Sequence, residues 1–322
     1  MQNVKRQRYL LREYINSLDV EKHCSEIVDL LSYTEFPFLS HKALEFALFR
    51  TYGIESVSKL LDKNGNFEPE KVCKRYDDTE VIVREASERD LRYVSEEEQR
   101  KRADLAIQRM NFIHSQYVIA NSDYIYVWCL FVVEAPKWID RFEFRQTTAL
   151  EKKAFYLHWI DIGQKMGIED LPKSFEEAAE FIETYEQKHM RYAPSNERVG
   201  CHTVNLFLSV VPTDFLKKVG RYVVYAMLDE RLAKSMGFPL WPRQVFGWAM
   251  DLLLTVRGQF IKYLMLPRTN PTHRLGPIDK TTGLRQLNFS PYGETYPKGY
   301  DLLGVGPRGC PYGKLSESGA RR

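Results

Sequence analysis

The sequence predicts an all-α protein: a single large helical domain of about ten helices, followed by an extended C-terminal arm. Three observations favour this fold class. Capping motifs precede several segments whose apolar residues recur every three or four positions, the spacing of an amphipathic helix. Alternation of apolar and polar residues, typical of strands, hardly occurs in the 322 residues. Hydrophobic residues make up 44% of the chain, which is enough for one large core.

Helix starts can be placed from local signals. In three places a serine or threonine is followed three residues later by a glutamate, and each pair opens a run with helical periodicity. The pairs are Ser95 with Glu98, Thr148 with Glu151, and Ser174 with Glu177. We therefore expect a helix to begin directly after each of these three hydroxyl residues.

Helix ends and core residues follow from similar reasoning. Gly53, Gly167 and Gly237 each follow a helical run, where a glycine can end the helix in the left-handed conformation. Asn64-Gly65 has no alternating segments beside it and predicts a loop. Among the five tryptophans, large side chains that are usually well buried, we expect three to fill the core. These are Trp128, Trp159 and Trp248.

The composition changes at Pro267, so we expect a helical domain over 1–266 and an arm over 267–322. The last 56 residues hold seven of the 15 prolines and nine of the 18 glycines. Proline removes backbone donors and glycine raises the entropy cost of ordering, so this segment should not be helical. Its apolar residues predict that it packs on the body, with a disordered end from about Leu315.

Charge, cysteine usage and hydropathy narrow the class of protein. The net charge of +3 does not favour nucleic-acid binding. Five cysteines without C-x-x-C spacing argue against a disulfide framework or a structural zinc site. Polar and basic residues follow Met1, and the strongest apolar stretch, 124–133, falls short of the roughly 20 residues of a membrane span. We expect a soluble, cytoplasmic protein without a transmembrane segment, at most peripheral to a membrane.

Common catalytic motifs are missing from the sequence. It contains no G-x-G-x-x-G, Walker loop, H-E-x-x-H or G-x-S-x-G. Any chemistry must therefore come from scattered side chains or from a cofactor held between helices.

His114 is the first candidate for such chemistry. The helix after Ser95 is expected to carry a stripe of Ala103, Ile107, Met110, His114 and Tyr117, spaced three or four apart. One interpretation is a core histidine hydrogen-bonded to a backbone carbonyl. The other is an axial haem ligand, because a neutral imidazole in an apolar slot suits haem iron. His158 and His202 are more typical of structural histidines.

Arg75 and Thr79 form a second candidate pair. They lie four residues apart on one helical face with Val72, Ile82 and Ala86, so they should be neighbours. Arg75 could extend its guanidinium to solvent from the margin of the core. Alternatively, it could pair with a buried anion such as a haem propionate, or shape an oxygen-binding pocket.

Six strings in the sequence support a family resemblance. They are FPF at 36–38, FALFRTYGI at 46–54, KRYDDTE at 74–80, RMNFIH at 109–114, GQKMGI at 163–168 and PRTNPT at 267–272. In this order they resemble the MpaB-type oxygenases, named for the fungal enzyme that shortens a farnesyl chain in mycophenolic acid biosynthesis. That family is similar to the latex-clearing rubber oxygenases, which hold haem b in an all-helical domain.

The resemblance implies a haem b-dependent dioxygenase that cleaves a carbon–carbon double bond in an isoprenoid or other lipophilic metabolite. Its partners would be that substrate and dioxygen. The resemblance implies that His114 is the iron ligand and that Arg75 and Thr79 lie near the haem. The alternatives are a haem enzyme that hydroxylates, desaturates or cyclises, and a non-catalytic protein that binds a hydrophobic ligand.

The chain departs from the family pattern in three respects. Asp78 stands where rubber oxygenases carry a lysine that can cap the haem iron, and a carboxylate does not replace that ligand. No carboxylate matches the acid/base residue of those enzymes, although Glu68, Glu70 and Glu80 lie nearby. The membrane anchor of the founding fungal enzyme has no counterpart in the sequence.

Overall fold

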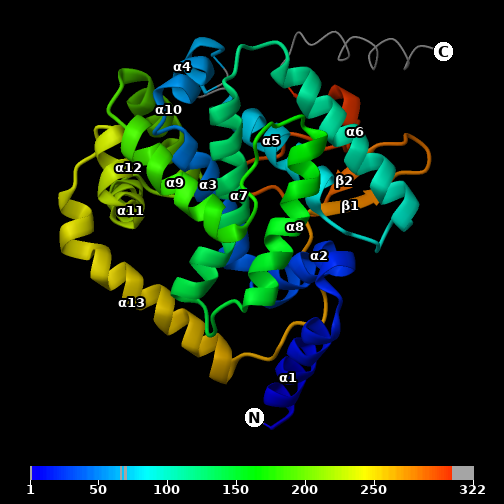
Figure 1. Ribbon diagram of the computed structural model, residues 1–322. Coiled ribbons are helices and arrows are strands. Elements are labelled where there is room, and N and C mark those ends of the chain that lie inside the picture. The colour runs from blue at the N-terminus through cyan, green and yellow to red at the C-terminus, as the bar shows by residue number, and fades with distance from the viewer. Residues whose placement is uncertain (1, 66, 69–70, 307–322) are drawn as a thin grey trace.

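A computed structural model describes residues 2–65, 67–68 and 71–306 and confirms the all-α fold (Figure 1). The helices are α1 (Gln2–Ser17), α2 (Val20–Asp29), α3 (Pro37–Thr51), α4 (Glu55–Lys63), α5 (Val72–Ser87), α6 (Glu96–His114), α7 (Asn121–Phe142), α8 (Ala149–Lys165), α9 (Phe175–His189), α10 (Pro194–Phe207), α11 (Asp214–Met227), α12 (Glu230–Ser235) and α13 (Trp241–Leu264). A π-helical turn (Leu30–Glu35), the short strands β1 (Leu275–Ile278) and β2 (Arg285–Leu287), and a 3-10 turn (Leu302–Gly304) complete the described elements.

The capping motifs mark helix starts as predicted. The Ser95 and Ser174 hydroxyls accept backbone hydrogen bonds at the starts of α6 and α9. Thr148 and Glu151 form a complete capping box at the start of α8. Each bond occupies a backbone N–H that a helix start leaves without an internal partner, so the local sequence determines where these helices begin.

The three helix-ending glycines behave in two different ways. Gly167 and Gly237 adopt φ angles of 73° and 65°, as predicted. The prediction for Gly53 is wrong, since this residue does not take the left-handed conformation. Gly53 instead allows a close approach, because a Cβ there would lie 2.7 Å from the Ser235 hydroxyl. Space, rather than backbone freedom, therefore requires glycine at this helix end.

Helix α7 is the centre of the core. Its side chains are buried along most of its length, and α3, α8 and α9 pack around it (Figure 1). Trp128 and Trp159 are both buried, as predicted. The Trp128 indole donates a hydrogen bond to the Trp159 carbonyl at 2.7 Å, which ties α7 to α8.

Helix α13 runs along the outside of the bundle (Figure 1). Trp248, at its middle, is 69% exposed, so the expectation that it fills the core is wrong. The cause is the orientation of α13, which turns Arg243, Asp251 and Arg257 toward the body, where each is paired. None of the described helices has the length and apolar run needed to cross a membrane.

The described part of the arm packs against α5, on the side of the molecule where β1 and β2 pair antiparallel. Arg274 and Arg285 are completely buried. Arg274 forms ion pairs with Asp77, at 2.5 Å, and with Glu80. Arg285 pairs with Glu85 at 2.8 Å. The domain boundary at Pro267 stays a prediction, and the expected disordered end lies outside the described residues.

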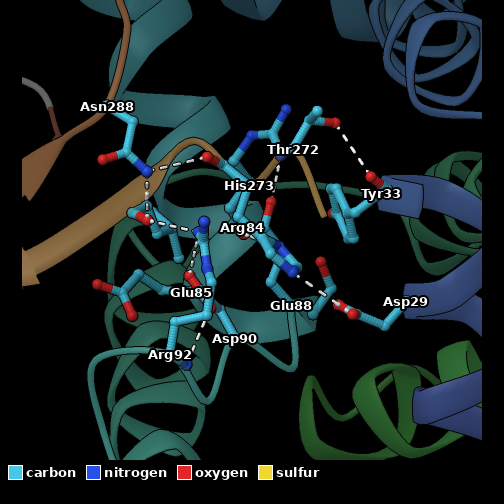
Figure 2. A network of polar contacts seen from close by, with 12 residues as sticks. Asp29, Tyr33, Arg84, Glu85, Glu88, Asp90, Arg92, Thr272, His273 and Asn288 are labelled. Carbon is cyan, nitrogen blue, oxygen red and sulfur yellow. Dashed lines mark hydrogen bonds and ion pairs between the residues drawn. The ribbon is translucent and has the colours of Figure 1, made fainter. Parts of the chain in front are cut away.

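His273 attaches the arm to the helical body at a third point, which Figure 2 shows. Its ring nitrogens lie 3.4 Å from an Asp29 carboxylate oxygen and 3.2 Å from a Glu88 carboxylate oxygen. Burial alone would lower the pKa of His273, but hydrogen bonds and charge from Asp29 and Glu88 outweigh it and raise this pKa to about 9. The imidazolium therefore joins the arm to α2 and α5 at neutral pH.

The arm attachment should depend on pH through His273. Because the folded pKa lies above the unfolded value of about 6.5, this stabilisation is complete below about pH 6.5 and is lost as pH rises through about 9. Between about pH 6.5 and about pH 9.5 we expect the wild type to lose on the order of 1–3 kcal/mol more unfolding free energy than His273→Gln. Urea denaturation at both pH values measures this, and equal losses in the two proteins would contradict the prediction.

Candidate functional site

A cavity of about 260 Å³ lies between the helices and contains the three candidate residues His114, Arg75 and Thr79 in its wall. Most of its lining is apolar, with residues from α3 to α8. Its size is near the lower end of small-molecule pockets. The periodicity of α5 and α6 therefore directs both candidate faces toward one space.

His114 is the last residue of α6 rather than the middle of a helical stripe. The chain turns at Ser115, and Tyr117 lies beyond the helix end. Tyr117 still lines the cavity because its N–H donates to the His114 carbonyl at 3.0 Å, in a tight turn. The helical extrapolation to Tyr117 was therefore wrong in geometry, although both side chains reach the same space.

The His114 imidazole is neutral and incompletely paired. Burial, and then the positive charge of Arg75, lower its pKa to about 4. Its Nδ1 atom is sealed from solvent and has no hydrogen-bond partner among the described residues. An unpaired buried polar atom costs about 1–3 kcal/mol. The backbone hydrogen bond that a purely structural histidine would need is not present at Nδ1 in this part of the chain.

Arg75 and Thr79 hydrogen-bond to each other on α5. The Arg75 guanidinium donates to the Thr79 hydroxyl, which donates to the Arg75 carbonyl at 2.8 Å. Within the described part of the chain Arg75 forms no ion pair with a carboxylate, unlike the buried Arg84, Arg274 and Arg285. Arg75 thus brings a positive charge to the cavity that remains available to an anion.

The same pair also lines a smaller cavity of about 60 Å³. This second space includes His41, Glu45 and Glu80 in its wall. Arg75 and Thr79 therefore form part of the partition between two cavities whose walls are both mostly apolar.

Two carboxylates line the His114 cavity. Asp78 accepts hydrogen bonds from Lys74, at 2.7 Å, and from the Tyr296 hydroxyl of the arm. Asp123 accepts from the hydroxyls of Ser56, at 3.0 Å, and Tyr185, at 2.5 Å. Asp78 is thus neutralised by a cation, whereas Ser56 and Tyr185 offer Asp123 neutral hydroxyls.

Sequence reasoning missed Asp123. It lies in the first turn of α7, where an aspartate is ordinarily explained by the helix dipole. Only the packing of α4 and α9 beside α7 brings Ser56 and Tyr185 to it. No signal in the sequence links these three residues.

The glutamates considered from the sequence lie elsewhere. Glu80 is paired with Arg84 and Arg274; burial would raise its pKa, but these arginines produce a net lowering. Glu68 is exposed and paired with Lys71 at 2.7 Å. Glu70 lies outside the described residues. Neither Glu68 nor Glu80 lines the His114 cavity.

His158 and His202, the other two histidines considered from the sequence, lie outside the cavity. His158 is buried, and its Nδ1 lies 3.0 Å from the Ser25 hydroxyl. His202 is half-buried on α10. Neither residue lines the His114 cavity.

The residues of the cavity fit a haem better than a bare metal ion. Among the described residues no group of three or more histidines, cysteines and carboxylates could hold a metal ion. One imidazole is sufficient for a haem, because the porphyrin nitrogens already bind the iron. The unpartnered Nδ1 of His114, the apolar walls and the available charge of Arg75 agree with that requirement.

Comparisons with known proteins match the chain to one family of oxygenases. Residues 99–257 match the family model described as "ER-bound oxygenase mpaB/B'/Rubber oxygenase, catalytic domain". The chain is 32% identical to the ER-bound oxygenase mpaB' of Penicillium brevicompactum over 257 residues, which are 74% of this chain and 58% of that protein. It is 34% identical to the ER-bound oxygenase mpaB of Penicillium roqueforti over 219 residues, 63% of this chain and 71% of that protein.

The match covers only part of some relatives. The chain spans 58% and 56% of the two Penicillium brevicompactum relatives. His114 lies inside the region matched by the family model, whereas Arg75 and Thr79 precede it. The identity and coverage of these relatives, together with the helical fold, show that the chain belongs to the family of ER-bound mpaB-type oxygenases and rubber oxygenases.

Proposed function

We propose that this protein is a haem b-dependent oxygenase that acts on a lipophilic isoprenoid or related secondary metabolite. The observation that carries the proposal is His114: a neutral imidazole, with an unpartnered buried nitrogen, in the wall of an apolar cavity. Membership of an oxygenase family favours an enzyme over a protein that only binds a hydrophobic ligand.

Haem b, when bound, would supply the activation of dioxygen, and the chain would supply binding and orientation. His114 would hold the haem iron through a ring nitrogen. Its low pKa keeps the imidazole lone pair available at neutral pH. Arg75 would place positive charge beside a propionate or beside the oxygen-binding side, and Thr79 would hold the guanidinium in position.

The reaction we propose is oxidative cleavage of a carbon–carbon double bond. An alkene and one dioxygen molecule give two carbonyl fragments, so both oxygen atoms enter the products and no external reductant is needed. The apolar walls would bind the alkene chain and exclude water. Hydroxylation, desaturation or cyclisation by the same cofactor would give different products, so product analysis by mass spectrometry distinguishes them.

Asp123 is the carboxylate that we propose for proton transfer. Its hydrogen bonds come from hydroxyl groups, so no cation competes for the carboxylate charge as Lys74 does at Asp78. Held at the cavity wall by Ser56 and Tyr185, it can accept or return a proton at its second oxygen.

His114→Ala should give a folded, helical protein without bound haem. The substitution removes the imidazole, and with it the proposed iron ligand and an unpartnered buried nitrogen, so the unfolding free energy should change by no more than about 1–3 kcal/mol. Absorption spectra of protein purified from haem-supplied cells should show a Soret band in the wild type and in the control His202→Ala, but not in His114→Ala. A full Soret band in His114→Ala would assign the ligand to another residue.

Arg75→Ala should separate haem binding from turnover. If Arg75 acts at the oxygen side, dioxygen consumption with a farnesyl-bearing aromatic substrate should fall by roughly tenfold or more while haem content stays near the wild-type value. If it pairs with a propionate, haem content should fall first. Arg100→Ala, at an exposed arginine of α6, is the control. Normal haem content together with normal turnover would leave Arg75 no role in the site.

Asp123→Asn should lower turnover by roughly 10²–10⁴-fold, the usual contribution of a general acid or base. The amide keeps an oxygen that can accept from Ser56 and Tyr185, so haem content and unfolding free energy should change little. Tyr185→Phe is the control, because it removes one hydrogen bond to Asp123 but keeps the carboxylate. Wild-type turnover in Asp123→Asn would exclude this role.

A further inference from the structure

A continuous apolar surface covers α11 and α13 on the outside of the bundle, and we call it the α11–α13 face. Ten large apolar or aromatic side chains of α13 are exposed, among them Trp241, Trp248 and Phe260. On α11, Phe215, Leu216, Val219 and Tyr222 are exposed as well. The two helices pack against each other, and the Tyr222 and Trp241 rings lie 4.8 Å apart.

Helix α13 is oriented opposite to an ordinary surface helix. Three of its four charged side chains face the body. The Arg243 guanidinium donates to the Ala226 carbonyl at 3.0 Å, Asp251 pairs with Arg141 at 2.7 Å, and Arg257 pairs with Glu143 at 2.9 Å. A surface helix usually turns its apolar stripe inward and its charges to water. The outward side of α13 therefore requires a second apolar environment.

The charge of the α11–α13 face indicates which kind of apolar environment it contacts. Apart from the three residues of α13 that face the body, α11 and α13 contain four basic residues and one acidic one, a net charge of +3. The basic residues are Lys217, Lys218, Arg221 and Lys262, and the acidic one is Asp214. This balance is complementary to a negatively charged surface.

We propose that the α11–α13 face docks on a membrane containing anionic phospholipid, with α13 lying in the plane of the interface. Tryptophan and tyrosine rings favour the boundary between headgroups and acyl chains, where Trp241, Trp248 and Tyr263 would lie. Helices with large apolar residues and lysine or arginine bind such interfaces without spanning them. The described helices lack a span, which agrees with this mode.

A second copy of the chain fits the face less well. In a two-fold symmetric dimer the same surface of each copy meets its counterpart, so a charge of +3 would face another +3. Lipid headgroups neutralise the same charge. The docking inference does not depend on the haem proposal.

Co-sedimentation of the full chain with vesicles tests the inference. Vesicles of phosphatidylcholine with phosphatidylserine should bind the wild type, and pure phosphatidylcholine vesicles should bind it more weakly. Trp248→Glu places a carboxylate in the face and should weaken binding by at least about tenfold. The matched control is Leu91→Glu, at an exposed leucine between α5 and α6, which should bind like the wild type.

Both substitutions are at exposed positions, so each variant should fold. Circular dichroism checks that it does. A blue shift of tryptophan emission on vesicle addition, reduced in Trp248→Phe, would support insertion of this side chain. Absence of wild-type binding to anionic vesicles, or equal binding by folded Trp248→Glu, would overturn the proposal. A wild-type dimer that Trp248→Glu converts to monomer, without vesicle binding, would assign the face to a second copy. Haem content plays no part in these readouts.

Discussion

Helix α5 is held in place by buried ion pairs with the C-terminal arm, and the candidate site depends on that helix. Asp77 and Glu85 of α5 are buried, and so is Glu88 directly after its end. Carboxylates remain charged in a protein interior only when they are paired, and removal of one partner of a buried pair costs about 3–5 kcal/mol. Arg274, Arg285 and His273 provide the partners. The arm is therefore part of the folded body rather than an appendage.

This pairing also determines the charge of the cavity. Arg274 and Arg285 of the arm pair with carboxylates of α5. Lys74 neutralises Asp78 on the same helix. Arg75 projects from the same helix into the cavity, where no carboxylate of the described chain pairs with it. Its charge adds to burial in lowering the pKa of His114. The neutral imidazole of His114 and the available guanidinium of Arg75 thus both depend on how the other charges around α5 are paired.

Local sequence signals predicted the parts of this arrangement that local chemistry determines. Caps located the starts of α6, α8 and α9, and helical spacing placed Arg75 next to Thr79. Their position opposite His114 followed from the family resemblance rather than from spacing. The missed features are long-range: Glu85 and Arg285 lie 200 residues apart, and Asp123 acquires its hydroxyl partners from two other helices. No periodicity records such contacts.

The error at Trp248 shows that the size and apolar character of a side chain do not determine whether it faces the core. A stripe of apolar residues predicts that a helix has two unlike sides, but not which side faces the protein. In α13 the inward side is selected by Arg141 and Glu143, which bind Asp251 and Arg257. Gly258 reinforces the choice, because a Cβ at that position would lie 2.6 Å from the Phe142 carbonyl oxygen. Rotating α13 to bury its apolar side would leave these ionic partners without each other and move a bulky face into a contact that only glycine allows. The ion pairs at the end of α7 and the close contact at Gly258 therefore indicate which side of α13 faces the bundle, and its apolar side is left exposed.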